Sequence, residues 1–186
     1  MITIVSGLPR SGTSLMMQML EAGGMPVLVD DVRRPDEDNP RGYYEYEPVR
    51  RTEQDNSWVS QAEGRAVKVV SPLLKHLPLQ FDYQIILMSR DLDETLQSQE
   101  QMLRRRGEPT GTDAPTMHRY FENHLRTVRE WLAEQQRMQF IECRFADLFQ
   151  QPRREVARIS AFLERDFDEA ALMQSIRPDL RRQRTQ

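Results

Sequence analysis

The stretch "SGLPRSGTSLMMQML" (residues 6–20) decides the fold of this chain. Gly7 and Gly12 bracket four residues, which is the glycine spacing of a phosphate-binding loop, but Thr13 stands where such a loop usually has lysine. This spacing lets backbone N–H groups surround an oxyanion, and the following helix adds its positive N-terminal end. The only strong positive charge in the loop is Arg10. We therefore predict an anion site at Gly7, Pro9, Arg10, Ser11, Gly12, Thr13 and Ser14.

The rest of the chain predicts an α/β fold around this loop. Residues 2–8 are apolar and β-branched, as in a buried strand, and residues 13–22 predict a helix ended by two glycines. We expect further strands at residues 25–30, 65–71, 83–90 and 139–145. We expect helices at residues 48–62, 91–106, 117–131 and 152–163. The alternation predicts a mainly parallel sheet of about four to five strands with helices on both faces, in which ligands bind at the carboxyl ends of the strands.

The composition limits the function classes. At 186 residues the chain is long enough for one domain, residues 1–186, and the net charge of −3 predicts no general attraction to nucleic acid. No apolar run is long enough to span a membrane, and the N-terminus does not resemble a signal peptide, so we expect a cytoplasmic protein. The single cysteine, Cys143, lies in an apolar stretch and is expected to be a buried thiol.

The motif "PRSGTS" after a first strand resembles the loop of the PAPS-dependent sulfotransferases, where PAPS is 3′-phosphoadenosine 5′-phosphosulfate. The resemblance implies a P-loop kinase-like three-layer sandwich that binds PAPS without a metal, with Arg10 contacting the 5′-phosphosulfate. No cluster of His, Cys and Asp suggests a metal site either. The reaction implied is transfer of the sulfuryl group to a hydroxyl or amine of a small-molecule or glycan acceptor, with PAP as the product. The C-terminal "FIECRFADLFQQPRREVARISAFL" is also similar to the family.

A second motif strengthens the resemblance. The family ends a central strand with an arginine and places a serine eight residues later, and both bind the ribose 3′-phosphate. In "SRDLDETLQS" these positions are Arg90 and Ser98. A helix with Asp91 as its N-cap and Glu94 in the capping-box position carries Ser98 two turns along, so its hydroxyl turns back toward the strand end. The basic tail around Arg181 and Arg182 is a further candidate for this phosphate by resemblance.

The resemblance also implies a base that deprotonates the acceptor. Where the cytosolic branch of the family has a catalytic histidine, this chain has Val70, and we interpret His76, His118 and His124 as structural. By resemblance to other branches, the base is a carboxylate, either Glu45 in "NPRGYYEYE" or Asp30 at the end of "MPVLVD". We prefer Glu45, because three neighbouring tyrosines could shield it and raise its pKa.

The basic residues differ in what they predict. Lys68 is one of two lysines among 26 basic residues, and its place at a predicted strand end favours a point charge on the transferring sulfuryl group. Arg104–Arg106 end a helix, where their charge suits its dipole. The segment that follows them could cover the site as a lid.

Two other functions fit parts of the sequence. A P-loop kinase for a small molecule would explain the loop, but it needs a magnesium-binding carboxylate at a strand end, and Asp91 is the only candidate. A catalytically silent nucleotide-binding protein would explain the missing histidine and the short chain. The sequence leaves the acceptor and the oligomeric state open.

Overall fold

A computed structural model describes residues 1–30, 32–33, 36, 39, 42–109 and 113–176. Its sheet contains β1 (Ile2–Gly7), β2 (Ala66–Val70), β3 (Tyr83–Ser89) and β4 (Met138–Arg144) in the order β2-β1-β3-β4. All three strand pairings are parallel. Gly7 at the end of β1 pairs with Val70 on one side and Met88 on the other, so three strands end at the same edge. The prediction of a parallel sheet is confirmed.

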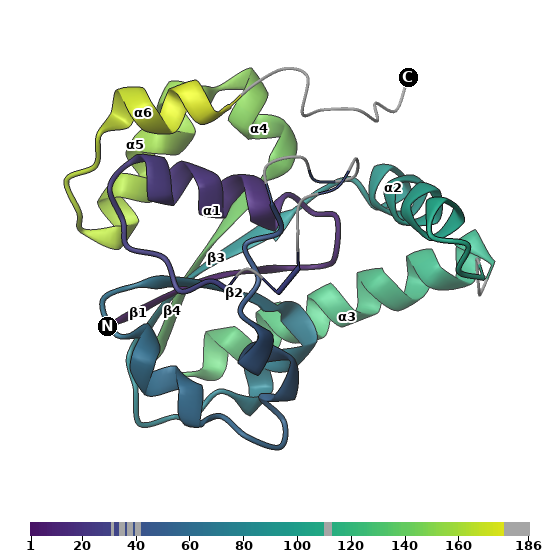
Figure 1. Ribbon diagram of the computed structural model, residues 1–186, viewed down its shortest axis with the longest axis horizontal. Coiled ribbons are helices and arrows are strands. Elements are labelled where there is room, and N and C mark those ends of the chain that lie inside the picture. Colours follow the sequence, from purple (N-terminus) through teal and green to yellow (C-terminus); the bar gives the residue numbers. More distant parts are fainter. Residues whose placement is uncertain (31, 34–35, 37–38, 40–41, 110–112, 177–186) are drawn as a thin grey trace.

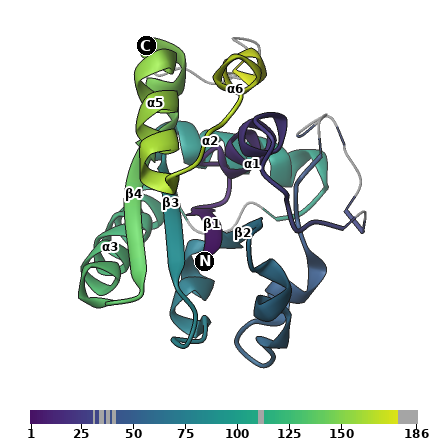
Figure 2. The ribbon, with the colours of Figure 1, turned by 90° about the vertical axis from the view of Figure 1, so that its left-hand side faces the viewer.

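Helices cover both faces of the sheet (Figure 1). On one face lie α1 (Thr13–Ala22), α4 (Phe145–Gln150), α5 (Pro152–Leu163) and α6 (Glu169–Ser175), and their apolar side chains form one core cluster with β1 and β3. On the other face lie α3 (Ala114–Glu134) and the 3-10 helices η1 (Glu47–Arg51), η2 (Ser57–Ala62) and η3 (Ser71–His76). Figure 2 shows the same layers from the side, which confirms the predicted sandwich.

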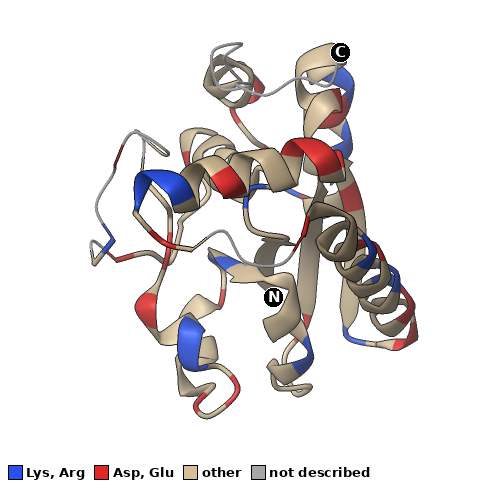
Figure 3. Cartoon of the chain, turned by 90° about the vertical axis from the view of Figure 1, so that its right-hand side faces the viewer, with Lys and Arg blue, Asp and Glu red and all other residues tan. Residues whose placement is uncertain are grey.

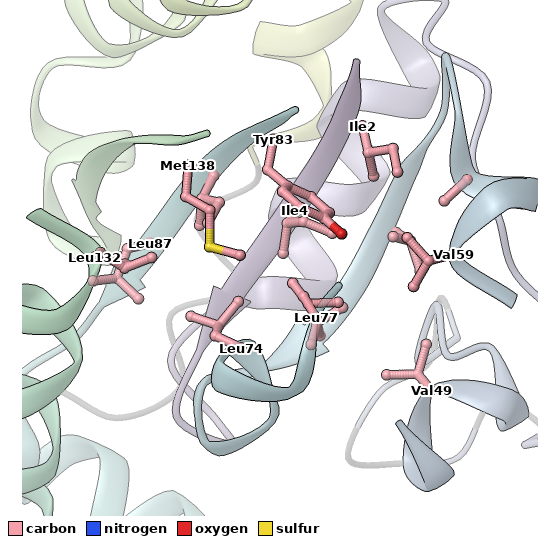
Figure 4. Packing of buried hydrophobic residues seen from close by; sticks show 14 of the residues in the cluster. Ile2, Ile4, Val49, Val59, Leu74, Leu77, Tyr83, Leu87, Leu132 and Met138 are labelled. Atoms are coloured by element: carbon pink, nitrogen blue, oxygen red, sulfur yellow. The ribbon is translucent and has the colours of Figure 1, made fainter. Parts of the chain in front are cut away.

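The second core cluster shows how α3 and the 3-10 helices are held (Figure 4). Ile2, Ile4 and Leu87 of the sheet share this cluster with Leu74 of η3 and Leu132 of α3, and all five side chains are almost completely buried. Because alternate residues of a strand face opposite sides, β1 supplies Ile4 to this cluster and Val5 to the other. A strand that is buried on both faces explains why residues 2–5 are all β-branched and mostly apolar.

Two sequence predictions were wrong. Residues 25–30 are not a strand of the sheet: Val27 makes a single bridge to Ala66, after which the backbone N–H of Asp30 donates to the carbonyl of Glu45. Pro26 has no N–H to extend a ladder. Residues 48–62 form the two short 3-10 helices η1 and η2 rather than one α-helix.

The remaining helix predictions were close. Asp91 caps α2 (Leu92–Arg105), since its side chain accepts a hydrogen bond from the backbone N–H of Glu94. Asp113 caps α3 in the same way. Cys143 is completely buried, as expected, and burial raises its pKa to about 12. Within the described residues, none of the helices has the length and apolar character needed to cross a membrane.

Candidate functional site

A cleft of about 400 Å³ opens at the edge where the strands end. Six cationic side chains and a single carboxylate, Glu45, line it among the described residues. The cations are Arg10, Arg33, Arg50, Lys68, Arg90 and Arg106. On the outer helices, by contrast, basic and acidic residues are interspersed (Figure 3). A chain with a net charge of −3 therefore concentrates positive charge in one place, which is the arrangement expected for an anionic ligand.

The predicted phosphate-binding loop contains three residues at positive φ, Gly7, Arg10 and Gly12. Gly12 has φ +101°, and a Cβ there would lie 2.4 Å from the Phe145 ring. A Cβ on Gly7 would lie 2.5 Å from Oγ of Ser11. Arg10 is one of the few non-glycine residues at positive φ, +71°. Alternating left-handed residues of this kind turn successive backbone N–H groups toward one point.

The start of α1 also fits an anion. The helix has no side-chain cap and no acidic residue in its first turn, so its N-terminal N–H groups and dipole are not neutralised by the helix itself. Ser11 is only 2% exposed, and its Oγ has no hydrogen-bond partner within the described part of the chain. An unpaired buried hydroxyl costs free energy, which an anion accepting its hydrogen bond would offset. The loop therefore fits a phosphate or phosphosulfate group.

The second predicted phosphate motif lies against the first. Nε of Arg10 donates to Oγ of Ser98 over 2.9 Å, and a terminal nitrogen of Arg90 lies 3.4 Å from the carbonyl of Arg10. The Arg90 guanidinium also packs over the ring of Phe145, 4.7 Å from its centroid. Residues that are 80 to 88 positions apart in the chain thus form one cluster. Arg10 reaches the serine that the resemblance assigns to the 3′-phosphate.

Glu45 lies in the cleft within a group of cations. Its carboxylate is 2.7 Å from Arg33, 2.9 Å from Arg50 and 3.4 Å from Lys68. Burial raises the pKa of Glu45, but the Lys68 charge and the hydrogen bond from Arg50 outweigh it, so the pKa lies below its usual value. The expectation of a raised pKa was therefore wrong. At neutral pH this carboxylate is ionised.

The three tyrosines explain why that expectation was wrong. The hydroxyl of Tyr43 donates to Asp36, that of Tyr44 to Glu21, and that of Tyr46 to Gln61. Each phenol therefore has its own polar partner, and cations rather than rings surround the Glu45 carboxylate. Tyr44 has φ +53°, a rare conformation that points the side chains on either side of it into the cleft wall.

Lys68 is the most deeply buried of the three cations around Glu45. Its side chain is 9% exposed, and its ammonium donates to the carbonyl of Tyr43 and lies beside Glu45. Burial lowers the pKa of Lys68 to about 8, even though the neighbouring Glu45 charge favours the protonated form. Lys68 is the third of the five residues of β2, so the predicted position at a strand end was wrong by two residues, but its side chain lines the cleft beside the loop.

Asp30, the alternative base, lies outside the residues that line the cleft. Its two carboxylate oxygens accept hydrogen bonds from the backbone N–H groups of Val32 and Glu47, at 3.1 and 2.5 Å. These bonds tie two segments of the connection between α1 and β2 together. The structure therefore gives Asp30 a local structural contact and gives Glu45 the place in the cleft.

The three histidines lie away from the cleft lining. His76 is 3.9 Å from Glu53, His118 is 4.0 Å from Asp93, and His124 shares a 2.8 Å hydrogen bond with Ser71. Burial lowers the pKa of His124, which favours its neutral form. Among the described residues, no group of three His, Cys, Asp or Glu side chains could hold a metal ion.

Sequence reasoning missed three arginines of the cleft. Arg106 donates to the hydroxyl of Tyr43 over 3.2 Å, whereas Arg104 pairs with Glu100 on the outer face of α2. Arg33 lies over the Tyr43 ring, and Arg50 reaches Glu45 from η1. In a chain with so many arginines, no local pattern distinguishes these from surface residues. Arg181 and Arg182 lie outside the described residues.

Comparisons with known proteins agree with this architecture. Solved structures with a similar fold include the sulfotransferase domain from the curacin biosynthetic pathway, with 16% identity, a TM-score of 0.57, and coverage of 96% of this chain and 78% of that one. Mouse sulfotransferase SULT7A1 in complex with PAP has 15% identity, a TM-score of 0.56, and coverage of 94% and 62%. A sulfotransferase from Alicyclobacillus acidocaldarius has 15% identity, a TM-score of 0.51, and coverage of 96% and 87%.

At these identities the solved structures establish the fold alone. A comparison with curated protein sequences found no match. The family model for the sulfotransferase domain, however, matches residues 2–185, which is almost the whole chain and includes both phosphate motifs. The chain therefore belongs to the sulfotransferase family.

Proposed function

We propose that this protein transfers the sulfuryl group of PAPS to a hydroxyl or amine of a small-molecule or glycan acceptor and releases PAP. One observation carries the proposal: the phosphate loop, Lys68, Arg90 and Ser98 line a single cationic cleft at the carboxyl edge of a parallel sheet. Mouse SULT7A1 and retinol dehydratase, which share the fold, have been crystallised with PAP, and the latter also with androsterone. The donor and the acceptor are the parts that the proposal adds to family membership.

The residues of the cleft fit the two anionic ends of PAPS. We assign the 3′-phosphate to Arg90 and Ser98, and the 5′-phosphosulfate to the backbone N–H groups of residues 7–14 and to Lys68. Bound there, PAPS would supply an activated sulfuryl group on a phosphate leaving group. Arg10, which reaches Ser98, is placed to bridge the two ends. Fixed N–H donors and cations in a partly buried cleft stabilise negative charge as it develops on the leaving phosphate.

We propose Glu45 as the base that takes the proton of the acceptor. It is the only carboxylate among the described residues that line the cleft, and it is ionised at neutral pH. Its lowered pKa makes it a weak base while Arg33, Arg50 and Lys68 surround it. An anionic donor that draws Lys68 toward itself would weaken one of these contacts and raise the proton affinity of Glu45. Lys68 therefore has two roles, on the donor and on the base.

The acceptor would lie against the apolar part of the cleft wall. Tyr46, Val49, Val70 and Leu73 line it on the side of η1 and η3. This wall favours an acceptor whose reacting hydroxyl or amine is attached to an apolar or aromatic group. Connections between strands and helices vary more in sequence and conformation than the sheet does. The phosphate motifs therefore do not identify the acceptor.

Nucleotide binding tests the proposal against a kinase and against a silent protein. We expect calorimetry to show tight binding of 3′,5′-ADP and weak binding of ATP with magnesium, because Arg90 and Ser98 select a 3′-phosphate. A preference for ATP with magnesium would contradict the proposal and favour a kinase. Binding of 3′,5′-ADP without transfer from PAPS to any of a broad panel of alcohols and amines would favour a silent nucleotide-binding protein.

A further inference from the structure

A buried carboxylate lies behind the Arg90 side of the cleft. Glu94 is 3% exposed and does not line the cleft, yet its Oε2 accepts a 3.0 Å hydrogen bond from Nε of Arg90, whose side chain is 7% exposed. The two residues are four positions apart, with Arg90 before α2 and Glu94 in its first turn. A negative charge so close to an arginine that should bind an anion calls for a physical reason.

The contacts of Arg90 supply one. Glu94 holds the Nε edge of the guanidinium, the carbonyl of Arg10 lies 3.4 Å from NH1, and the ring of Phe145 covers one face. The guanidinium is thus fixed at one edge, at its tip and on a face. A bidentate contact with phosphate requires two parallel N–H groups in a fixed orientation, and a side chain that is already ordered loses less entropy on binding.

We propose that Glu94 is a positioning residue, which holds Arg90 in the orientation that binds the 3′-phosphate of the donor without touching the donor itself. The inference rests on the proposed function, because it requires a 3′-phosphate at Arg90. It opposes a simple electrostatic expectation. If the charge of Glu94 mattered more than its hydrogen bond, removal of Glu94 would strengthen anion binding, since it would remove a negative charge close to the anion.

The ratio of the affinities for 3′,5′-ADP and 5′-AMP isolates this effect, because the two ligands differ only in the 3′-phosphate. We expect Glu94→Ala to lower the ratio at least about tenfold, by calorimetry, while the affinity for 5′-AMP stays nearly constant. Glu94→Gln should keep the ratio within about threefold of the wild type, because its amide oxygen can still accept the Nε–H of Arg90. A purely structural role would lower the melting temperature of both variants and leave the ratio unchanged.

Glu155 provides a matched control. It is 4% exposed, lies in the first turn of α5, and pairs with Arg158 at 2.6 Å, away from the cleft. Glu155→Ala should lower the melting temperature without changing the ratio. A ratio that rises in both Glu94 variants, or that stays at the wild-type value in Glu94→Ala, would overturn the inference.

Two double variants keep the test decisive if Glu94→Ala fails to fold. Arg90→Ala/Glu94→Gln and Arg90→Ala/Glu94→Ala contain neither an unpaired buried arginine nor an unpaired buried carboxylate, and they should have equal ratios, because residue 94 acts only through Arg90. Unequal ratios would contradict the inference. A wild-type ratio near one would instead show that the protein has no site for the 3′-phosphate. This result would contradict both the proposed function and the role of Glu94. The wild type alone thus distinguishes the two failures.

Discussion

The two ends of the cleft are built from different kinds of structure. The donor end, which comprises residues 7–14, Arg90 and Ser98, consists of strand ends and helix starts that the sheet register brings to one edge. The Glu45 end, which comprises Arg33, Glu45 and Arg50 around Lys68, belongs mostly to the connection between α1 and β2. A backbone motif at the ends of strands and helices can be predicted from the sequence. A charge network on a connection cannot, because it depends on how the connection packs against the sheet.

Under the proposed function, the same difference separates binding from chemistry. The donor end offers N–H groups and guanidinium groups, which hold anions. The Glu45 end offers the one carboxylate of the described cleft lining, with the cations that control its proton affinity. Substitutions at the two ends should therefore have separable effects on nucleotide affinity and on turnover.

The largest effect is expected at the Glu45 end. Glu45→Gln should lower kcat about 10³-fold, because the amide cannot accept the acceptor's proton, and should leave 3′,5′-ADP binding unchanged or tighter. Steady-state kinetics with PAPS and calorimetry check the two parts. Asp30→Asn is the control: it should keep most of kcat and cost about 1 kcal/mol of stability through its two backbone hydrogen bonds. A larger loss of kcat in Asp30→Asn would move the base to Asp30, and no loss in either variant would refute both assignments.

At the donor end, Arg90→Ala should weaken 3′,5′-ADP binding about 100-fold, since it removes two charge-assisted hydrogen bonds worth about 1.5 kcal/mol each. The affinity for 5′-AMP should change little. Arg129→Ala serves as a control, because Arg129 pairs with Glu142 between α3 and β4 and does not line the cleft. Equal losses for both nucleotides would mean that Arg90 does not bind the 3′-phosphate.

The phosphate loop can be tested through its backbone. Gly12→Ala should destabilise the fold by about 2–3 kcal/mol, for two reasons. The new Cβ would clash with the Phe145 ring, and the positive φ of residue 12 would be strained for alanine. Gly24→Ala is a matched control: its φ is +93°, but a Cβ there has nothing within 4 Å, so only about 1 kcal/mol is expected. Urea unfolding measures both, and equal losses would show that the Phe145 contact does not constrain Gly12.

The smallest effect concerns pH. Burial lowers the pKa of Lys68 to about 8, so its ammonium is protonated below that pH and loses its charge above it. Because the proposed function places the donor against the charged form of Lys68, kcat/KM for PAPS should be constant near pH 7 and fall about tenfold per pH unit well above pH 8. Lys68→Arg keeps its charge throughout this range, so its profile should lack the alkaline decrease. A decrease in both proteins would have to come from another group.

Much of the fold could be predicted from local patterns. The apolar run of β1, the glycines of the loop and the capping residue Asp91 each specify their element within a few residues, because hydrophobic period and backbone sterics act locally. The failure at residues 25–30 has the opposite cause. An apolar hexapeptide is compatible with a strand, but whether it joins the sheet depends on the partner beside it, and here only Val27 makes a bridge.

The sequence by itself determined the glycine loop before α1, the position of Arg90 after β3 and of Ser98 on α2, and the family. These depend on glycine backbone freedom and on fixed spacings along a strand and a helix. Only the tertiary structure decided the electrostatics. It brought Arg33, Arg50 and Lys68 to Glu45 and so reversed the expected direction of its pKa shift. It also placed Arg106 on Tyr43 and Glu94 on Arg90. A pKa depends on distances of a few ångströms between groups that are far apart in the chain, and no local pattern encodes those distances.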